Sequence, residues 1–251
     1  MKKNTTVVNI NCKLNKVPFE IEVPYTMKPG MRNLGDSEPI TYQDCLSPYY
    51  LTEKKRLCSV IYGNNVNKSL YNKALEYLQC SNYREATENY QEDFVVWSAN
   101  TDGDLSPQIM SVCFPSGWAP EEKINLSFHG IHEPVADNKL IQQAAPHIAK
   151  MLTQKGPFVR HVWTVTNSDK LSRHPKTITP WSNESPDQMY YRVERQTTVP
   201  LGDAAIFFIR VYVVPLLTMN IDKIKESINT MSDAVLGYKN LNYVKEILND
   251  V

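Results

Sequence analysis

The sequence predicts an α+β fold, in which about five strands form an antiparallel sheet with helices on one of its faces. Three observations support this prediction. Long segments carry apolar residues at the three- and four-residue spacing of an amphipathic helix. Other segments are rich in β-branched and aromatic residues, which is typical of strands. These strand-like segments follow one another through hairpin-length or loop connections, which favours antiparallel pairing, and they occupy residues 90–97, 105–114, 158–166, 190–199 and 204–215.

The N-terminal part of the chain combines irregular and helical patterns. Residues 7–23 show short β-branched alternations, typical of edge strands or of an extended arm. Proline and glycine punctuate residues 24–31 and exclude a regular helix there. Residues 51–62 and 69–80 repeat apolar side chains at helical spacing, so each predicts an amphipathic helix. At 100–104 an Asp-Gly pair predicts a hairpin turn, and the aspartates there lack the full spacing of a calcium-binding loop.

Helices and one long loop alternate with the later strands. Residues 139–153 have helical periodicity, and Pro146 near their middle predicts a kink or a split into two helices. Residues 168–187, rich in Ser, Pro, Asn and Thr, predict a surface loop. Two closing helices are predicted at 221–236 and 241–248, on either side of a break at Gly237.

Composition restricts the class of protein. The 251 residues are 42% hydrophobic, enough for one large or two small domains with a proper core. With 27 basic and 27 acidic residues, the chain lacks the electrostatic footprint of nucleic-acid or anionic-membrane binding. No stretch approaches a membrane span, and the short mixed alternation after Met1 does not resemble a targeting segment. We therefore expect a soluble, cytoplasmic protein.

The five cysteines also favour the cytoplasm. Their number is odd and their spacing wide, which is typical of buried or half-buried thiols in a reducing compartment. Cys113, which precedes Phe-Pro-Ser-Gly, is the candidate for a catalytic cysteine. No basic residue adjacent in sequence would lower the pKa of its thiol, so a structural role is the stronger interpretation.

Two of the five histidines lie three residues apart in the stretch 112–136. Pro134 keeps Glu133 out of helical geometry, which places His132 at or near a helix end or in a tight loop. A histidine in such an apolar context is more often a hydrogen-bonded structural residue than a metal ligand. No HExxH or CxxC spacing indicates zinc. If His132 does bind a metal, a lone histidine fits haem iron better, because haem already supplies four nitrogen ligands.

Two of the predicted strands carry unusual charge. Alternation along residues 190–199 puts Arg192, Glu194 and Gln196 on one face and Arg195 on the other. Arg210 interrupts an apolar strand, where a buried guanidinium requires an acid or an anion. One interpretation is an internal pair of Arg210 or Arg195 with Glu194. The other is a functional site, in which these charges face a haem propionate or a polar pocket beside the haem.

Short motifs spread over nearly the whole chain resemble, in their order, the family of haem-dependent oxidative N-demethylases. The catalytic subunit of that family has a haem-binding PAS-like core. The motifs are PYTMKPGM near Tyr25, LTEKKRL at 51–57, YQEDFVVW at 90–97, CFPSGWAPEEK at 113–123, IHEPV at 131–135, RHVWTV at 160–165, RVERQT at 192–197, IRVYVVPL at 209–216 and LGYKNL at 236–241.

The resemblance implies a PAS-like antiparallel sheet with flanking helices and an N-terminal arm. The whole chain, residues 1–251, would form one haem-binding domain, with the arm and first helices in 1–89, the PAS-like core in 90–216 and closing helices in 217–251. One b-type haem would be held by His132 as the iron ligand, with Trp118 and Arg210 as further haem contacts. The residues implied for catalysis are Tyr25, Arg160, Glu194 and Arg195.

The activity implied by the resemblance is oxidation of a small nitrogen-containing substrate, an amine or an amino-acid-like molecule, by dioxygen. Arg160 or Arg195 would donate hydrogen bonds to dioxygen, and Glu194 would bind or deprotonate an amine. Electrons would come from a separate reductase, because the sequence contains no dinucleotide fingerprint and no iron–sulfur cysteine run. The protein could also form an oligomer. Alternation does not decide which face of the sheet holds the haem.

Two other functions share these residues. The first is a haem-based gas or redox sensor, or a PAS-like interaction module without a cofactor, for which an apolar pocket and an attached output domain are typical. The second is a haem enzyme of a biosynthetic pathway with different nitrogen chemistry, which the sequence does not separate from a demethylase.

Overall fold

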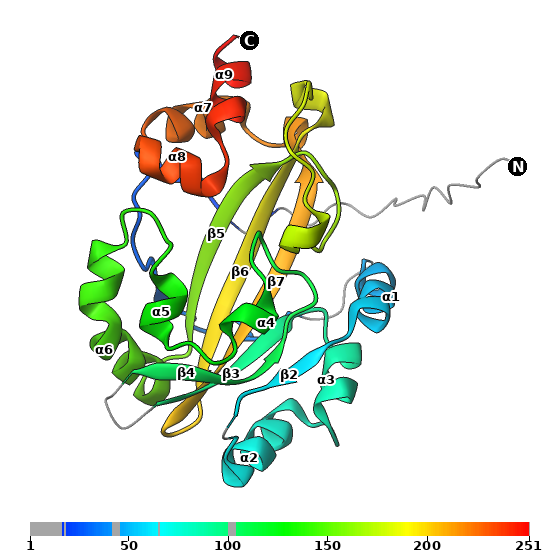
Figure 1. Cartoon of the computed structure of the whole chain (residues 1–251), viewed down its shortest axis with the longest axis vertical. Helices are drawn as coiled ribbons and strands as arrows, with labels where there is room; N and C mark the ends of the chain where they lie inside the picture. Colours follow the sequence, from blue (N-terminus) through cyan, green and yellow to red (C-terminus); the bar gives the residue numbers. More distant parts are fainter. Residues whose placement is uncertain (1–16, 18, 42–45, 65, 100–103, 251) are drawn as a thin grey trace, which may run out of the picture.

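The computed structural model describes residues 17, 19–41, 46–64, 66–99 and 104–250 of the chain (Figure 1). Within them, every pair of neighbouring strands is antiparallel and the order across the single seven-stranded sheet is β1-β5-β6-β7-β3-β4-β2. The predicted α+β class is therefore confirmed. The strands are β1 (Arg32–Asn33), β2 (Val60–Tyr62), β3 (Asp93–Ala99), β4 (Leu105–Ser111), β5 (Phe158–Thr166), β6 (Tyr190–Pro200) and β7 (Ala204–Pro215).

The long strands lie where the sequence predicts them. The predicted bounds 158–166 and 204–215 are those of β5 and β7, because both are unbroken β-branched and aromatic runs. The two additional strands, β1 and β2, are edge strands of two and three residues. A run that short contains too little alternation to stand out in the sequence. Most of the turn predicted at 100–104 lies outside the described residues, but β3 and β4 do pair as its two arms.

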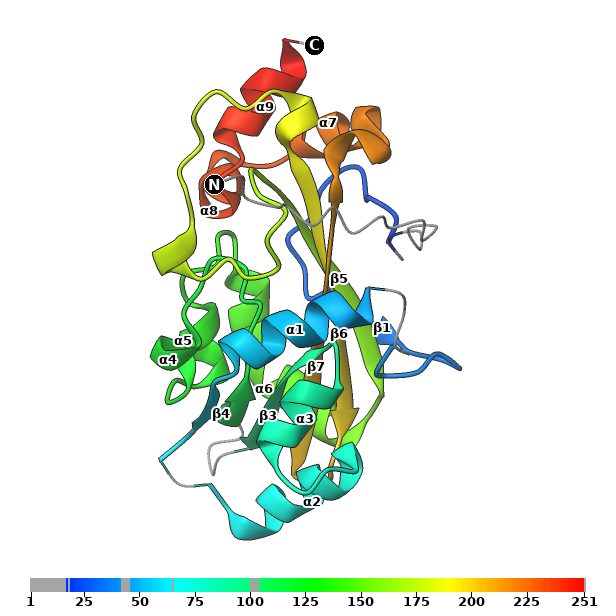
Figure 2. The same ribbon diagram turned by 90° about the vertical axis from the view of Figure 1, so that its right-hand side faces the viewer.

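Helices cover both faces of the sheet, so the prediction of helices on one face only is wrong. The helices are α1 (Ser47–Leu57), α2 (Lys68–Leu78), α3 (Tyr83–Asn89), α4 (Pro120–Lys123), α5 (Phe128–His132), α6 (Lys139–Gln154), α7 (Ile221–Asn229), α8 (Asp233–Lys239) and α9 (Asn242–Asn249). Figures 1 and 2 show α4, α5 and α6 on one side of the sheet and α1, α2 and α3 on another.

Alternation along the central strands separates two cores. Phe94 and Phe208, paired across β3 and β7, pack with α2 and α3. Their sequence neighbours Val95 and Phe207 face the other way and pack with α5 and α6. We call these the α2 face and the α5 face. The far end of the α2 face, beyond β3, is covered by α7, α8 and α9 through apolar residues such as Trp163 and Val214.

Several helix bounds differ from the prediction. The helix predicted at 51–62 is α1, which ends at Leu57, and its last residues form β2 instead. The helix predicted at 221–236 is two helices. Asn220 caps α7 by accepting from the Lys223 amide, and Ser232 caps α8 by accepting from the Val235 amide.

The remaining differences concern single residues within helices. Gly237 lies inside α8 rather than at a break, and α8 ends at Lys239, where the capping residue Asn240 adopts a left-handed φ of 55°. The helix α6 runs unbroken through Pro146, so the alternative of two separate helices is wrong. The short helix α3 was not predicted. No helix in the described ranges has both the length and the apolar character needed to cross a membrane.

Candidate functional site

Arg192 of β6 fastens two loops onto the α5 face. Its side chain is 1% exposed. One terminal nitrogen donates to the Leu171 carbonyl at 2.7 Å, and the other donates to the Phe114 carbonyl at 2.9 Å. The Nε donates to Ser116 Oγ at 2.8 Å. Burial of the guanidinium lowers the pKa of Arg192 to about 10, which leaves it charged at neutral pH.

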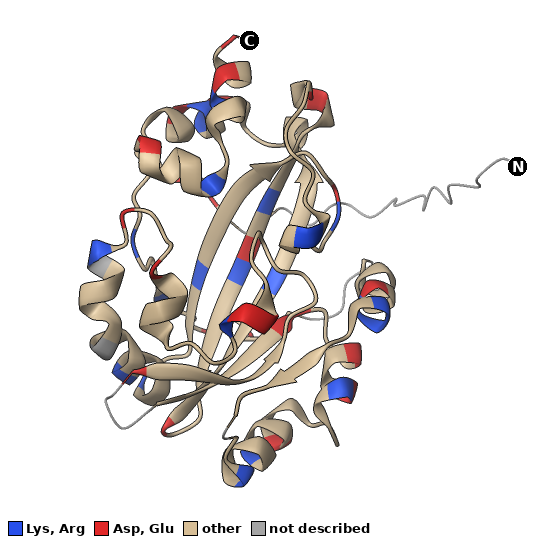
Figure 3. Cartoon of the chain, in the orientation of Figure 1, with Lys and Arg blue, Asp and Glu red and all other residues tan. Residues whose placement is uncertain are grey.

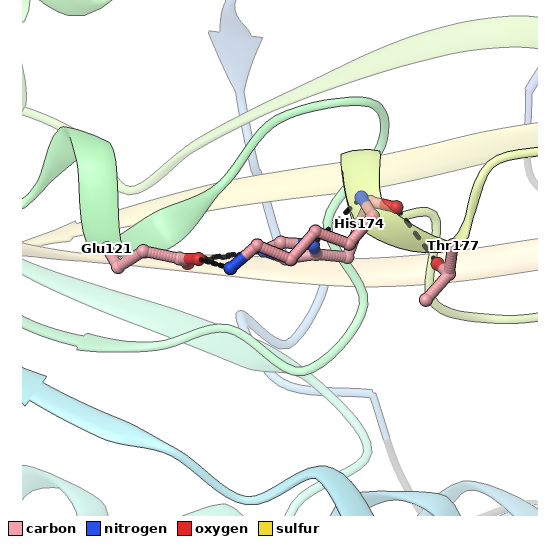
Figure 4. Close-up of polar contacts among 4 residues, drawn as sticks. Glu121, His174 and Thr177 are labelled. Carbon is pink, nitrogen blue, oxygen red and sulfur yellow. Dashed lines mark hydrogen bonds and ion pairs between the residues drawn. The ribbon is translucent and has the colours of Figure 1, made fainter.

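The same two loops bond to each other beyond Arg192. The Arg173 amide donates to the Pro115 carbonyl and the Gly117 amide donates to the Arg173 carbonyl, both at 2.9 Å. At the surface, Glu121 of α4 contacts His174 Nε2 at 3.1 Å, with Lys176 Nζ at 3.4 Å (Figure 4). These contacts are partly exposed and contribute little to stability. Arg192 and the backbone bonds are therefore what fixes the loops.

Glu194 lies two residues after Arg192 on β6 and begins a series of hydrogen bonds that crosses from β6 to β5. Its carboxylate accepts hydrogen bonds from Ser116 Oγ and from Gln196 Nε2, the latter at 2.7 Å. Gln196 Oε1 in turn accepts from Arg160 Nε of β5 at 2.6 Å, and Arg160 also donates to the Pro29 carbonyl at 3.3 Å. We call Ser116, Glu194, Gln196 and Arg160 the polar chain. Figure 3 shows charged residues of both signs gathered on β5, β6 and β7.

Helix α8 brings a phenol and an ammonium to the Arg160 end of this chain. Lys239 Nζ donates to the Trp163 carbonyl of β5 at 2.7 Å and lies 5.5 Å from the centre of the Tyr25 ring. Burial lowers the pKa of Lys239 to about 8, while Glu194 opposes the shift. Burial also raises the pKa of Tyr25 to about 12, with Tyr238 adding to the effect. Tyr25, Tyr238 and Lys239 thus lie within electrostatic reach of the polar chain.

His132 is the last residue of α5, which confirms its predicted place at a helix end. The predicted reason is wrong, because Glu133 keeps helical dihedral angles, with φ at -55° and ψ at -43°. Its Nδ1 is 2.7 Å from the Phe128 carbonyl. Because a carbonyl only accepts, Nδ1 carries the proton and Nε2 keeps its lone pair. Burial lowers the pKa of His132 to about 4, with the charge of Arg160 acting in the same direction. The imidazole is therefore neutral at pH 7, the form that ligates metals, and it lies within reach of the polar chain.

The residues around His132 fit the haem that the sequence leads us to expect. In the described ranges, no group of three or more His, Cys, Asp or Glu side chains could hold a metal ion. A single histidine suffices for haem, because the macrocycle supplies four ligands. Trp118, Phe128 and Ile131 are partly buried beside α5 and offer the apolar contacts a macrocycle needs. Arg160 adds a positive charge within electrostatic reach of His132.

Arg195 and Arg210, two other candidates from the sequence, lie on the α2 face, away from the polar chain. They are paired across β6 and β7. Arg195 donates to the Glu38 carbonyl at 2.6 Å and to the Pro39 carbonyl at 3.1 Å, and the Arg210 guanidinium lies 4.0 Å from the centre of the Tyr50 ring. The predicted pair of either arginine with Glu194 is wrong, because strand alternation directs Glu194 to the opposite face.

Cys113 has the environment of a structural thiol. It is 3% exposed, and burial raises its pKa to about 12, so the reactive thiolate is disfavoured at neutral pH.

Sequence reasoning missed the roles of Ser116, Tyr238 and Lys239. Gln196 lies on the face of Glu194, as alternation predicts, but its bonds to Glu194 and Arg160 were not predicted. No local pattern distinguishes Lys239 from a surface lysine.

Comparison with models of known protein families identifies a family for this chain. A family model described as "Haem-dependent oxidative N-demethylase, alpha subunit-like" matches residues 48–249. This range contains His132, the whole polar chain and Lys239, whereas Tyr25 precedes it. A search of the curated proteins found no match.

Proposed function

The chain belongs to the haem-dependent oxidative N-demethylase, alpha subunit-like family, and from this premise we propose that it is a haem-dependent oxidoreductase that oxidises a small nitrogen-containing substrate with dioxygen. The observation that carries the proposal is His132. Its neutral imidazole keeps the Nε2 lone pair and lies within electrostatic reach of the Arg160 guanidinium, which in turn lies within electrostatic reach of the Glu194 carboxylate.

The haem in this proposal is a b-type haem on the α5 face. His132 Nε2 would bind the iron, and Trp118, Phe128 and Ile131 would contact the macrocycle. The Phe128 carbonyl, by accepting from Nδ1, holds the imidazole in the tautomer and orientation that such a ligand needs. When bound, haem supplies the binding and activation of dioxygen.

Glu194 is proposed as the residue that binds the substrate amine. Its carboxylate is 9% exposed and accepts from two neutral donors, Ser116 and Gln196, which hold it in place without cancelling its charge. It can attract a protonated amine and accept its proton. Arg160, fixed by Gln196, can donate hydrogen bonds to negative charge that develops during oxygen chemistry.

The proposed reaction is the oxidative removal of a methyl group from nitrogen. A C–H bond of the methyl group breaks and a C–O bond forms, giving a carbinolamine with one oxygen atom of dioxygen. The other oxygen atom leaves as water, after taking up two electrons and two protons. The C–N bond of the carbinolamine then breaks, which releases formaldehyde and the shortened amine.

The two electrons are proposed to come from a separate reductase, which the word "subunit" in the family description supports. Haem-loaded protein given dimethylamine and NADPH alone should release no formaldehyde above background. Ascorbate with a redox mediator should replace the reductase and restore formaldehyde release. Samples without amine serve as the control. Turnover with NADPH and no added protein or mediator would show that the chain accepts nicotinamide electrons itself.

The amine role of Glu194 gives a second test. We expect Glu194→Gln to weaken binding of dimethylammonium to the ferric haem-loaded protein about tenfold, since a charge-assisted hydrogen bond is lost. The change would be followed as a shift of the Soret band during titration. Glu122→Gln, an exposed residue of α4, is the control and should leave the affinity unchanged. Equal amine affinity in Glu194→Gln and the parent protein would contradict the role.

A further inference from the structure

The Glu194 carboxylate lies among several cations. Three cations, Arg160, Arg192 and Lys239, lie within electrostatic reach of one carboxylate, Glu194. Among the described residues, no ion pair within 4.0 Å involves any of these four side chains. The Glu194 carboxylate instead accepts from Ser116 and Gln196, which are neutral.

The guanidinium of Arg192 is not available to a ligand. Its three nitrogens all donate within the protein, to Ser116 and to the carbonyls of the two loops. The side chain is also sealed from solvent, at 1% exposed. The positive charge that remains for a ligand therefore belongs to Arg160 and Lys239.

Arg160 and Lys239 both keep donors and partial exposure. An ammonium has three N–H donors, and Lys239 uses one on the Trp163 carbonyl. A guanidinium has five, and the bonds of Arg160 to Gln196 and Pro29 involve two of its nitrogens. Neither side chain is fully buried. Each can therefore donate further hydrogen bonds to a molecule that approaches the edge of β5.

Aromatic rings fix the ammonium in position. Lys239 Nζ lies 5.5 Å from the centre of the Tyr25 ring and 5.8 Å from that of Trp163. Such rings attract a cation by their quadrupole but do not neutralise it. Burial is the main cause that lowers the pKa of Lys239, and repulsion by the charge of Arg160 acts in the same direction. An anion between them would remove this repulsion.

We propose that Lys239 of α8 and Arg160 of β5 together bind a carboxylate group beside the edge of β5, carried either by a haem propionate or by the substrate. The planar fork of a guanidinium matches the two oxygens of a carboxylate, and the ammonium adds a point charge beside it. This inference rests on the proposed function for the identity of the carrier, whereas the carboxylate site itself rests on the two cations.

The first experiment tests the propionates as the carrier. The affinities of the protein for haemin and for haemin dimethyl ester, in which both propionates are esterified, are measured by absorbance titration. We expect haemin to bind about tenfold more tightly, the effect of a charge-assisted hydrogen bond, and Lys239→Gln to reduce this ratio to near one. Lys239→Arg should retain the ratio. Because both ligands need the same fold, their ratio is insensitive to any loss of stability in the variant.

A matched control comes from α2. Lys73 Nζ also donates to a backbone carbonyl, that of Leu201, at 2.7 Å, but it lies on the α2 face. Lys73→Gln loses a comparable hydrogen bond and charge, and we expect it to leave the haemin-to-ester ratio unchanged. An equal fall in Lys73→Gln and Lys239→Gln would overturn the assignment.

The second experiment tests the substrate as the carrier and needs no haem. Acetate is titrated into the haem-free protein while tryptophan fluorescence is recorded, because Trp163 lies under the Lys239 ammonium. A saturable change that is lost in Lys239→Gln supports the carboxylate site. If the haemin-to-ester ratio does not depend on Lys239 but acetate binding does, the substrate is the carrier.

The outcomes separate the two proposals. If haemin fails to bind at all, the proposed function fails, and the acetate titration alone decides the carboxylate site. If haemin binds, yet neither the ratio nor the acetate response depends on Lys239, the carboxylate site is overturned and Lys239 only ties α8 to β5.

The carboxylate site also predicts a pH dependence. Acetate needs the protonated ammonium, and the pKa of Lys239 is about 8. The groups that face it are Glu194 and Arg160 from the sheet and Tyr25, whose pKa of about 12 keeps it neutral. Acetate affinity should therefore fall as the pH rises through about 8 in the parent protein. In Lys239→Arg, which stays charged, the affinity should not fall there. A fall of the same size in both proteins would contradict the role of Lys239.

Discussion

His132→Ala should lose haem. Loss of a residue that merely orients a metal ligand typically costs about 10–100-fold in affinity, so loss of the ligand itself should cost at least about 100-fold. Purified His132→Ala should therefore lack the Soret band of the parent protein, or show it strongly shifted, after loading with haemin. Added imidazole, which replaces the missing ligand, should partly restore the spectrum.

The chain offers a matched control in His161. Burial lowers the pKa of His161 to about 4, as it does that of His132, so both imidazoles are neutral. His161, however, is on the α2 face, where its ring stacks on Phe19 at 5.1 Å. We expect His161→Ala and the exposed His129→Ala to keep the haem spectrum, and the same holds for His147→Ala and His174→Ala. An unchanged Soret band in His132→Ala would disprove the ligand assignment.

Strand alternation made part of the site predictable. Period-two alternation along β6 separates Glu194 from Arg195, and the structure confirms it. The pattern within one strand says nothing about which helices pack on each face, however. That depends on where α5 and α6 fold back, which is a tertiary contact. For this reason the sequence left Arg195 among the catalytic candidates beside Glu194.

The residues that the sequence analysis missed come from distant parts of the chain. Lys239 reaches the polar chain because β1 pairs with β5 only at its first two residues, which leaves the rest of that edge to α8. The short length of β1 is itself invisible in the sequence. Likewise, Ser116 gains its role from Arg192, which lies 76 residues further along. Local periodicity contains no information about such contacts.

Arg192→Leu should destabilise the protein more than any other substitution on the α5 face. It removes a buried guanidinium that donates to the Leu171 and Phe114 carbonyls and to Ser116. Leucine leaves these acceptors buried without their donor, and it removes one of the cations within electrostatic reach of the Glu194 carboxylate. Breaking a buried charged network of this kind typically costs about 3–5 kcal/mol in the free energy of unfolding. Urea unfolding followed by circular dichroism would measure the loss.

Arg173→Leu is the control for the loss of any arginine side chain from this region. Arg173 lies in the same loop, and its amide and carbonyl bond to Pro115 and Gly117, contacts that leucine retains. We expect this variant to lose less than about 1 kcal/mol, as substitutions away from a buried network usually do. Arg192→Lys should recover only part of the stability, because an ammonium cannot reach both carbonyls and Ser116 with the geometry of the guanidinium fork. Equal urea midpoints for Arg192→Leu and Arg173→Leu would show that Arg192 does not fix the two loops. The hydrogen bond from Ser116 to Glu194 would then depend only on the backbone bonds between the loops.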